Sequence, residues 1–176
     1  MPLLINYLLV FTLLTIGRCN PVPNEIFRNS VKPMAVSYKV IGIKDGDTFV
    51  LLMGGKEQVV RLAHIDCPEK KQPFGNNAKQ FASGVCFGKK VMLLHHNKYD
   101  RNKRLIAEVL LEDGQNINKE LVRNGLAWYF KKYSDSREYA ALEAEARLRK
   151  KGLWADKAPI APWNWRHRKK TGIKNV

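Results

Sequence analysis

Three short polar segments of this sequence carry acids and arginines at spacings that helices and strands do not require. They read Asp45-Gly46-Asp47-Thr48, Arg61-Leu62-Ala63-His64-Ile65-Asp66-Cys67-Pro68-Glu69 and Asp100-Arg101-Asn102-Lys103-Arg104. Each comes at the end or the start of an expected strand, so in a closed barrel the segments can converge on one rim. Converging acids can bind a hard cation, and arginines beside them can bind phosphate oxygens.

Each segment taken alone has an ordinary structural explanation. Asp-Gly between two apolar runs is a hairpin signal, although the hairpin needs Asp45-Gly46 and does not need Asp47. Asp66-x-Pro68-Glu69 is also compatible with a loop after a strand, and 100–104 with a charged turn. The presence of all three segments in order favours the chemical interpretation.

The composition points to a folded protein with a polyanionic partner. The chain has 176 residues, Lys+Arg 31 against Asp+Glu 16 and a formal net charge of +15, so its field attracts phosphates before specific contacts form. With 45% hydrophobic and 27% charged residues, it is not a disordered polycation. An exported polycation that acts on membranes or glycosaminoglycans would share this composition. The GxSxG, Walker A, HExxH and CxxC patterns are missing from the sequence.

The apolar periodicity predicts the elements that position these segments. Five β-branched or apolar runs separated by turn residues predict strands at Tyr38–Ile43, Thr48–Met53, Gln58–His64, Lys90–Asn97 and Leu105–Leu111. Helical spacing predicts helices at Asn76–Phe87, from Ile117 to Leu126, and at Ser136–Lys151, the last with Ser136 as N-cap and Gly152 as C-cap. This order predicts an α+β fold, a five-stranded OB-type Greek-key β-barrel with three α-helices.

The chain outside this domain has three expected parts. The apolar run Leu3–Ile16 is shorter than the ~20 residues of a spanning helix and is typical of a signal peptide, here 1–19, for a secreted or periplasmic protein. An uncleaved membrane anchor and lipidation at Cys19 are the alternatives. Residues 20–36 form an extended lead-in to the domain at 37–156, and 157–176 form a basic tail that frays.

Two cysteines remain if the signal peptide is removed. Cys67 and Cys86 form a disulfide or stay as buried thiols, and both alternatives are open.

The three segments resemble the signature regions of the staphylococcal-nuclease-like thermonucleases. The resemblance runs from about Val40 to Trp154 and is carried by DGDTFVLLMGGKEQVVRLAHIDCPE and DRNKRLIA. The second region departs from the family pattern D-[KR]-Y-G-R, because Asn102 and Lys103 stand where Tyr and Gly are common. The departure affects base stacking more than catalysis.

The resemblance implies a role for each candidate. Asp47, Asp66 and the backbone carbonyl of Cys67 would ligate one Ca²⁺ with waters, as suits an ion that binds oxygen ligands, and Asp45 would order the turn and a metal-bound water. Glu69 would activate the attacking water. Arg61 and Arg104 would bind the scissile phosphate.

The resemblance also implies the substrate. It predicts a monomeric nuclease that cuts DNA and RNA with little sequence preference and leaves 3′-phosphate ends, with no stable membrane partner. Candidates for contacting the substrate are Tyr99, Asp100, Arg101 and Tyr133, with Tyr129 as a further candidate for base stacking. An inactive nucleic-acid-binding OB module is the alternative.

Overall fold

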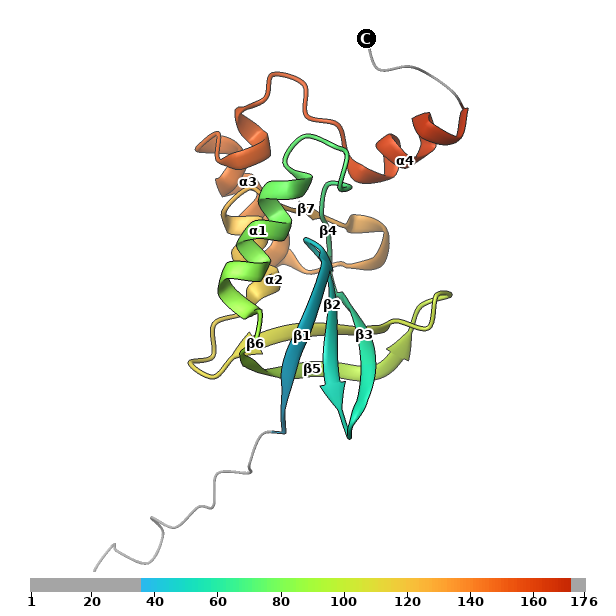
Figure 1. Ribbon diagram of the computed structural model, residues 1–176. Coiled ribbons are helices and arrows are strands. Elements are labelled where there is room, and N and C mark those ends of the chain that lie inside the picture. Colours follow the sequence, from blue (N-terminus) through green and yellow to red (C-terminus); the bar gives the residue numbers. More distant parts are fainter. Residues whose placement is uncertain (1–35, 172–176) are drawn as a thin grey trace, which may run out of the picture. The chain divides into compact units, whose positions relative to one another are not determined.

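Five strands close into a barrel in residues 36–171, the part of the chain that the computed structural model describes (Figure 1). Around the barrel the strand order is β1-β2-β3-β6-β5, and β3 pairs with β6 in parallel whereas the other neighbours are antiparallel. The strands are β1 (Ser37–Asp45), β2 (Thr48–Met53), β3 (Lys56–Leu62), β5 (Lys90–Tyr99) and β6 (Leu105–Leu111). The predicted barrel of OB type is confirmed, and two of the five strands have the predicted bounds.

The barrel interior is filled by alternate residues of these strands. Along β6, buried and half-buried side chains alternate strictly, as expected for a strand with one face on the core. Fully buried side chains from the other strands include Val40, Phe49, Val60 and Val91. Burying a side chain of this size stabilises the fold by about 1.5–3 kcal/mol.

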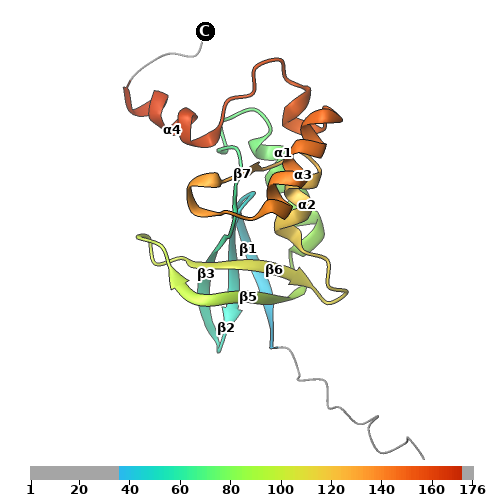
Figure 2. The same ribbon diagram turned by 180° about the vertical axis from the view of Figure 1, so that it is seen from behind.

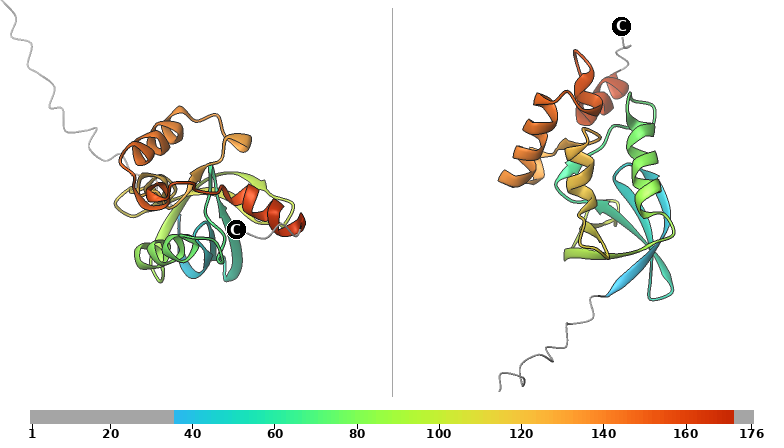
Figure 3. Two further views of the ribbon diagram at one scale, coloured as in Figure 1. Left: turned by 90° about the horizontal axis from the view of Figure 1, so that it is seen from above. Right: turned by 90° about the vertical axis from the view of Figure 1, so that its left-hand side faces the viewer.

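Three helices lie side by side at one end of the barrel (Figure 3). Helix α1 (Gly75–Cys86) packs on β1, α2 (Ile117–Arg123) packs on β6, and α3 (Arg137–Leu148) packs on α2. The predicted cap of α3 is confirmed, because the Ser136 hydroxyl accepts a hydrogen bond of 3.4 Å from the backbone N–H of Tyr139. Helix α3 ends before Gly152, however, and Gly152 instead begins the 3-10 helix η2 (Gly152–Ala155) with a left-handed φ of 52°.

The structure contains elements that the sequence analysis did not predict. Strands β4 (Ile65–Asp66) and β7 (Trp128–Tyr129) pair in a separate two-stranded sheet (Figure 1). The 3-10 helix η1 (Lys131–Tyr133) follows β7 (Figure 2). The prediction that the basic C-terminal segment frays is wrong for Pro162–Thr171, because these residues form helix α4. Proline suits the first turn of a helix. Trp163 also packs against buried Trp128, an apolar contact that the basic composition of the segment does not indicate.

A tight turn joins β1 to β2 at the first of the three polar segments. The Asp45 carboxylate accepts a hydrogen bond of 3.2 Å from the backbone N–H of Asp47 and so closes the turn. A Cβ atom at Gly46 would lie 2.7 Å from the Cβ of Ala78 in α1 and 2.9 Å from the sulfur of Cys67. Glycine is therefore needed here for close approach of the turn to α1.

A polar network fixes the turn between β3 and β4, just before Asp66. On β6, the Glu108 carboxylate accepts hydrogen bonds from the Tyr139 hydroxyl at 2.7 Å and from the Asn116 amide at 2.5 Å. Its other oxygen lies 3.5 Å from Nε2 of His64, which has a left-handed φ of 67° in that turn. The contact with His64 and the two hydrogen bonds lower the pKa of Glu108 from 4.5 to about 2, against the opposing effect of burial.

This shift predicts a loss of stability in acid. A carboxyl group with a lowered folded-state pKa stabilises the fold above its unfolded value, so the contribution is complete above pH 4.5 and is lost as the pH falls toward about 2. We expect Glu108→Gln to lower the free energy of unfolding by about 2 kcal/mol at pH 6 and by much less at pH 2.5. Urea unfolding at both pH values measures the difference. An equal loss at both would contradict the assignment.

Two cysteines lie within the described residues. Cys67 and Cys86 are both free and buried in the core, so within the described residues the structure has thiols at these positions and no disulfide.

In residues 36–171, no helix is long and apolar enough to cross a membrane. The expected signal peptide at 1–19 and the lead-in up to residue 35 lie outside the described residues.

Candidate active site

Strand register brings the three polar segments to one end of the barrel. Thr48, just after the Asp45-Gly46-Asp47 turn, pairs with Asp45 on β1 and with Arg61 on β3. On the other side of β3, Val60 pairs with Leu105, the residue after Arg104. The second and third segments are far apart in the sequence, and the parallel β3–β6 pairing places them side by side.

Arg61 lies between the two candidate metal-binding acids. Its guanidinium group is 3.2 Å from Oδ2 of Asp47 and 2.8 Å from Oδ1 of Asp66, and it also donates to the carbonyls of Leu62 and Ile65 at 2.9 and 3.0 Å. Its side chain is 13% exposed. Burial by itself would lower the pKa of Arg61, but the charges of Asp47 and Asp66 raise it. Arg61 is therefore a rigid, charged group with its contacts set by the backbone around it.

Thr48 connects Asp47, and through it Arg61, to Arg104. Its hydroxyl donates a hydrogen bond of 3.3 Å to Oδ1 of Asp47 and accepts one of 3.3 Å from the Arg104 guanidinium. Asp100 holds Arg104 from the other side, with 2.7 Å contacts to its Nε and Nη2. Both predicted phosphate-binding arginines thus lie in one hydrogen-bonded network with Asp47.

Asp100 shapes its own turn. Its carboxylate accepts backbone hydrogen bonds from Asn102 and Arg104 at 2.9 and 3.0 Å. Partial burial alone would raise the pKa of Asp100, but the hydrogen bonds from Arg104 lower it. All these contacts are to residues of the turn, so Asp100 orients Arg104.

The acids at the centre are crowded and poorly hydrated. Burial, together with the charge of Asp47, raises the pKa of Asp45 to about 6. The pKa of Asp66 is also raised. Burial is the main cause, the charge of Asp47 adds to it, and Arg166 and Arg61 offset only part of the increase. Because burial disfavours the charged form of these carboxylates, an additional cation at the site would stabilise that form.

Glu69 lies in the loop between β4 and α1. Its backbone N–H donates to the side-chain oxygen of Gln72 at 3.1 Å, and its carbonyl accepts from the Gln72 N–H at 2.8 Å. A Cβ atom at Gly75, where α1 begins, would lie 2.0 Å from the Glu69 carbonyl, so only glycine permits this loop to pack on the helix. The Glu69 side chain is 41% exposed and accessible to water.

Arg166 of α4 is a site residue that the sequence analysis missed. Its Nη1 lies 2.7 Å from Oε1 of Glu69 and its Nη2 lies 2.7 Å from Oδ2 of Asp66. The sequence analysis assigned Arg166 to a basic tail. Pro162 followed by tryptophans at 163 and 165 was the available signal, because proline at a first helical position before apolar residues is typical of a helix start.

The residues fit a hard divalent cation, as judged from their chemistry. Asp47 and Asp66 are 5% and 2% exposed, both carry oxygen ligands, and a backbone N–H of Cys67 orients Asp47 at 2.6 Å. Burial raises the pKa of the Cys67 thiol well above its ordinary value, so its sulfur stays protonated and does not compete as a ligand. Within residues 36–171, no three His, Cys, Asp or Glu side chains gather in a group able to hold a metal ion, so the fit rests on two carboxylates and the backbone carbonyl of Cys67.

The substrate-contact candidates differ in exposure. Tyr99 is 55% exposed and Tyr133 is 71% exposed, and Arg101 is also exposed, so all three are accessible to a ligand. Tyr129 is 5% exposed and its hydroxyl donates to the Ser134 carbonyl at 2.6 Å. The expectation of base stacking by Tyr129 is therefore wrong, because β7 pairs with β4 and turns this ring into the core.

Comparison with known proteins agrees with the arrangement. The sequence pattern of the family described as Staphylococcal nuclease homologue matches residues 59–156. A protein of Escherichia coli O157:H7 named "Uncharacterized endonuclease" is 38% identical over 131 residues, which are 74% of this chain and 85% of that protein. A Haemophilus influenzae protein of the same name is 38% identical over 97% of this chain and 88% of its own length. "Micrococcal nuclease" of Shigella flexneri is 36% identical over 75% of this chain and 81% of its own length.

The family match runs from within β3 to the residue after η2 and includes Arg61, Asp66, Glu69 and Arg104. Nuclease chemistry on nucleic acid substrates is therefore the activity that the relatives support. The chain belongs to the staphylococcal nuclease family.

Proposed function

We propose that this nuclease depends on Ca²⁺ and hydrolyses DNA and RNA alike with little sequence preference, leaving 3′-phosphate ends. One observation carries the proposal: Asp47, Arg61, Asp66, Thr48 and Arg104 form one network of contacts, and Arg166 joins Glu69 to it. A module that only bound nucleic acid would not need buried acids beside its arginines. The expected export through 1–19 belongs to the same proposal, and the mass of the mature protein tests it.

The arginines would bind and orient the scissile phosphate. A phosphodiester gains negative charge in the five-coordinate transition state, and planar guanidinium groups held in place stabilise that charge without reorganising. Arg61 is held by carbonyls and acids, and Arg104 is held by Asp100 and Thr48. Both groups are therefore set before the substrate binds.

Glu69 would take the proton of the attacking water. The water oxygen forms a bond to phosphorus and the bond from phosphorus to the 5′ oxygen breaks. The 5′ oxygen takes a proton from solvent water and leaves as a hydroxyl group. The exposed carboxylate of Glu69 suits this role, because the attacking water must come from solvent. Asp47, Asp66 and the carbonyl of Cys67 would hold the divalent ion, which when bound would supply positive charge to the phosphate oxygens.

Metal removal and Asp66→Asn test the proposal together. We expect cleavage of plasmid DNA and of single-stranded RNA in Ca²⁺, loss of both in EGTA, and recovery when Ca²⁺ is restored. Asp66→Asn removes one of two charged ligands, so we expect it to weaken Ca²⁺ binding at least tenfold, on the order of the effect of losing a charged ligand. Gel assays measure cleavage, and calorimetry measures the affinity for Ca²⁺.

The control is Glu112→Gln, which neutralises an exposed acid on the loop after β6. We expect the control to bind Ca²⁺ and to cut as the natural protein does. Tight binding of DNA and RNA with no cleavage in Ca²⁺ would overturn the proposal in favour of a binding module. Undiminished cleavage in EGTA would overturn its metal dependence.

A further inference from the structure

Helix α4 lies beyond residues 59–156, the segment that the family pattern matches, yet it contributes a side chain to the candidate active site. Arg166 is the contributing residue, and it contacts Asp66 and Glu69. Arg61 and Arg104 already supply two arginines at the barrel rim, and Arg166 adds a third from outside the barrel.

An aromatic cluster holds the first turn of α4 in place. The ring of Trp163 stacks on Phe130 with centroids 5.2 Å apart and rings within 3° of parallel, and it meets Trp128 edge-on at 5.6 Å. Ala161, just before the helix, is 5% exposed. Residues three apart lie on the same face of a helix, so packing of Trp163 directs Arg166 toward the same side of the molecule.

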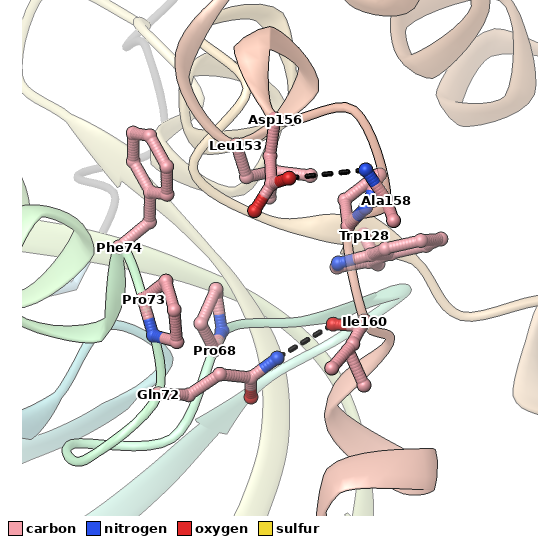
Figure 4. Close-up of a pocket in the computed structure, with 10 residues that line it drawn as sticks. Pro68, Gln72, Pro73, Phe74, Trp128, Leu153, Asp156, Ala158 and Ile160 are labelled. Carbon is pink, nitrogen blue, oxygen red and sulfur yellow. Dashed lines mark hydrogen bonds between the residues drawn. The ribbon is translucent and has the colours of Figure 1, made fainter. Parts of the chain in front are cut away.

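The segment before α4 is joined to the loop that carries Glu69. Gln72 is 6% exposed, and its side-chain amide donates to the Ile160 carbonyl at 2.5 Å (Figure 4). Its side-chain oxygen accepts from the Glu69 N–H. The cavity beside it, lined by Pro68, Phe74, Trp128 and Ile160 among others, has a volume of about 40 Å³. That volume suits about one water molecule and excludes a nucleotide. The cavity is therefore a packing feature, and the segment fits closely to the loop.

Arg166 contacts both oxygens of the Asp66 carboxylate. Its Nη2 lies 2.7 Å from Oδ2, its Nη1 lies 3.3 Å from Oδ1, and Arg61 approaches Oδ1 at 2.8 Å as well. Asp66 is 2% exposed, so its oxygens have no further open side to solvent. A divalent ion ligated by Asp66 would therefore compete with guanidinium groups for these two oxygens. Arg61 has other partners to hold it in place, whereas the contacts of the Arg166 guanidinium are to the two acids.

We propose that Arg166 is the internal counter-ion of the metal site: it neutralises Asp66 and Glu69 in the metal-free protein and leaves Asp66 when the divalent ion binds. The inference rests on the proposed role of Asp66 as a metal ligand. Arg166 is then a positioning residue, which acts through the two acids. At 41% exposure its side chain can move into solvent without leaving a buried charge, and Trp163 keeps α4 in place meanwhile.

Calorimetric titration of Ca²⁺ without nucleic acid tests the competition. Arg166→Gln removes the competing charge, so we expect Ca²⁺ to bind about twofold to fivefold more tightly, the range of a partly exposed ion pair. Arg166→Lys keeps the charge without the planar fork, so its affinity should fall between the two. Arg168→Gln is the matched control, because it removes the same charge from an exposed position on α4 and should leave the affinity unchanged.

Two variants separate the failure of this inference from the failure of the proposed function. If Asp66→Asn binds Ca²⁺ as tightly as the natural protein does, then Asp66 is not a ligand and both proposals fall. If Asp66→Asn loses binding while Arg166→Gln equals or falls below the natural affinity, then only the counter-ion role is overturned. A gain in Arg168→Gln equal to that in Arg166→Gln would reduce the effect to net charge and would also overturn it.

Thermal unfolding gives a second readout that does not depend on titration heats. In EGTA, Arg166→Gln removes the partner of Glu69 and one of the two arginine partners of Asp66, so its melting temperature should fall below that of the natural protein. In saturating Ca²⁺ the difference should shrink, because the ion replaces the lost charge. If Arg166 had a purely structural role, the difference in melting temperature would be the same in both conditions. That result would contradict the proposal.

Discussion

Glu69→Gln is expected to lower the rate of DNA cleavage by about 10²–10⁴-fold at saturating Ca²⁺ while the affinity for DNA stays within a few-fold of the natural value. The physical reason is that an amide is nearly the same size as the carboxylate but cannot accept a proton from water. Glu69 is 41% exposed and its backbone is held by Gln72, so the substitution should leave the fold intact. Single-turnover cleavage of a fluorescent duplex, with binding measured in parallel, gives the two quantities.

The control for this prediction is again Glu112→Gln, an exchange of the same type at an exposed position away from the site. Because Glu69 also contacts Arg166, the variant should be measured alongside Arg166→Gln. Full cleavage by Glu69→Gln would contradict the assignment of Glu69 as the base. A matching loss of DNA affinity and rate would assign Glu69 to substrate binding instead.

Arg61→Lys is expected to lower kcat by about 10²–10³-fold, which is the usual effect of losing one preorganised donor to a transition-state charge. A lysine ammonium is a point charge on a flexible chain, so it cannot reach Asp47, Asp66 and the carbonyls of Leu62 and Ile65 at once. Arg104→Lys should lose most activity for the same reason. Because Arg104 is more exposed and is held mainly by Asp100, its replacement should perturb stability less.

Stability measurements separate the two causes of a lower rate in these variants. Arg61 is 13% exposed and satisfies two carbonyls, so Arg61→Lys should also lower the melting temperature, whereas Arg104→Lys should lower the rate with a smaller change in melting temperature. Arg149→Lys, on the exposed end of α3, is the control for an arginine-to-lysine exchange. Turnover near the natural rate in either variant would contradict the phosphate-binding roles.

The strands and most of the core could be predicted because their signal is local. In β6, alternate residues from Leu105 to Leu111 face the core, and this alternation is present in the sequence. The Asp-Gly turn and the Ser136 cap also depend on residues a few positions apart. The short pair β4–β7 was not predictable, since two-residue strands have no periodicity and are formed by contacts between distant residues.

The residues of the candidate site also divide into those that the sequence indicates and those that depend on contacts between distant parts of the chain. Asp47, Arg61, Asp66, Glu69 and Arg104 were identified by type and spacing, and the structure brings them into one network. The base-stacking role of Tyr129 failed, because exposure depends on which neighbours cover a ring. Arg166 was missed because its partners Asp66 and Glu69 are about a hundred residues away in the chain.

The sequence by itself therefore determined the barrel, the three helices and the residue types that a nuclease of this family needs. These features follow from local periodicity and from the order of short motifs. The tertiary structure decided which charges meet: the β3–β6 pairing places Arg104 beside the first two segments, and the aromatic contacts of Trp163 bring Arg166 to the acids. Contacts of this kind are between residues distant in the chain, so they depend on how the elements pack and leave no repeating pattern in the sequence.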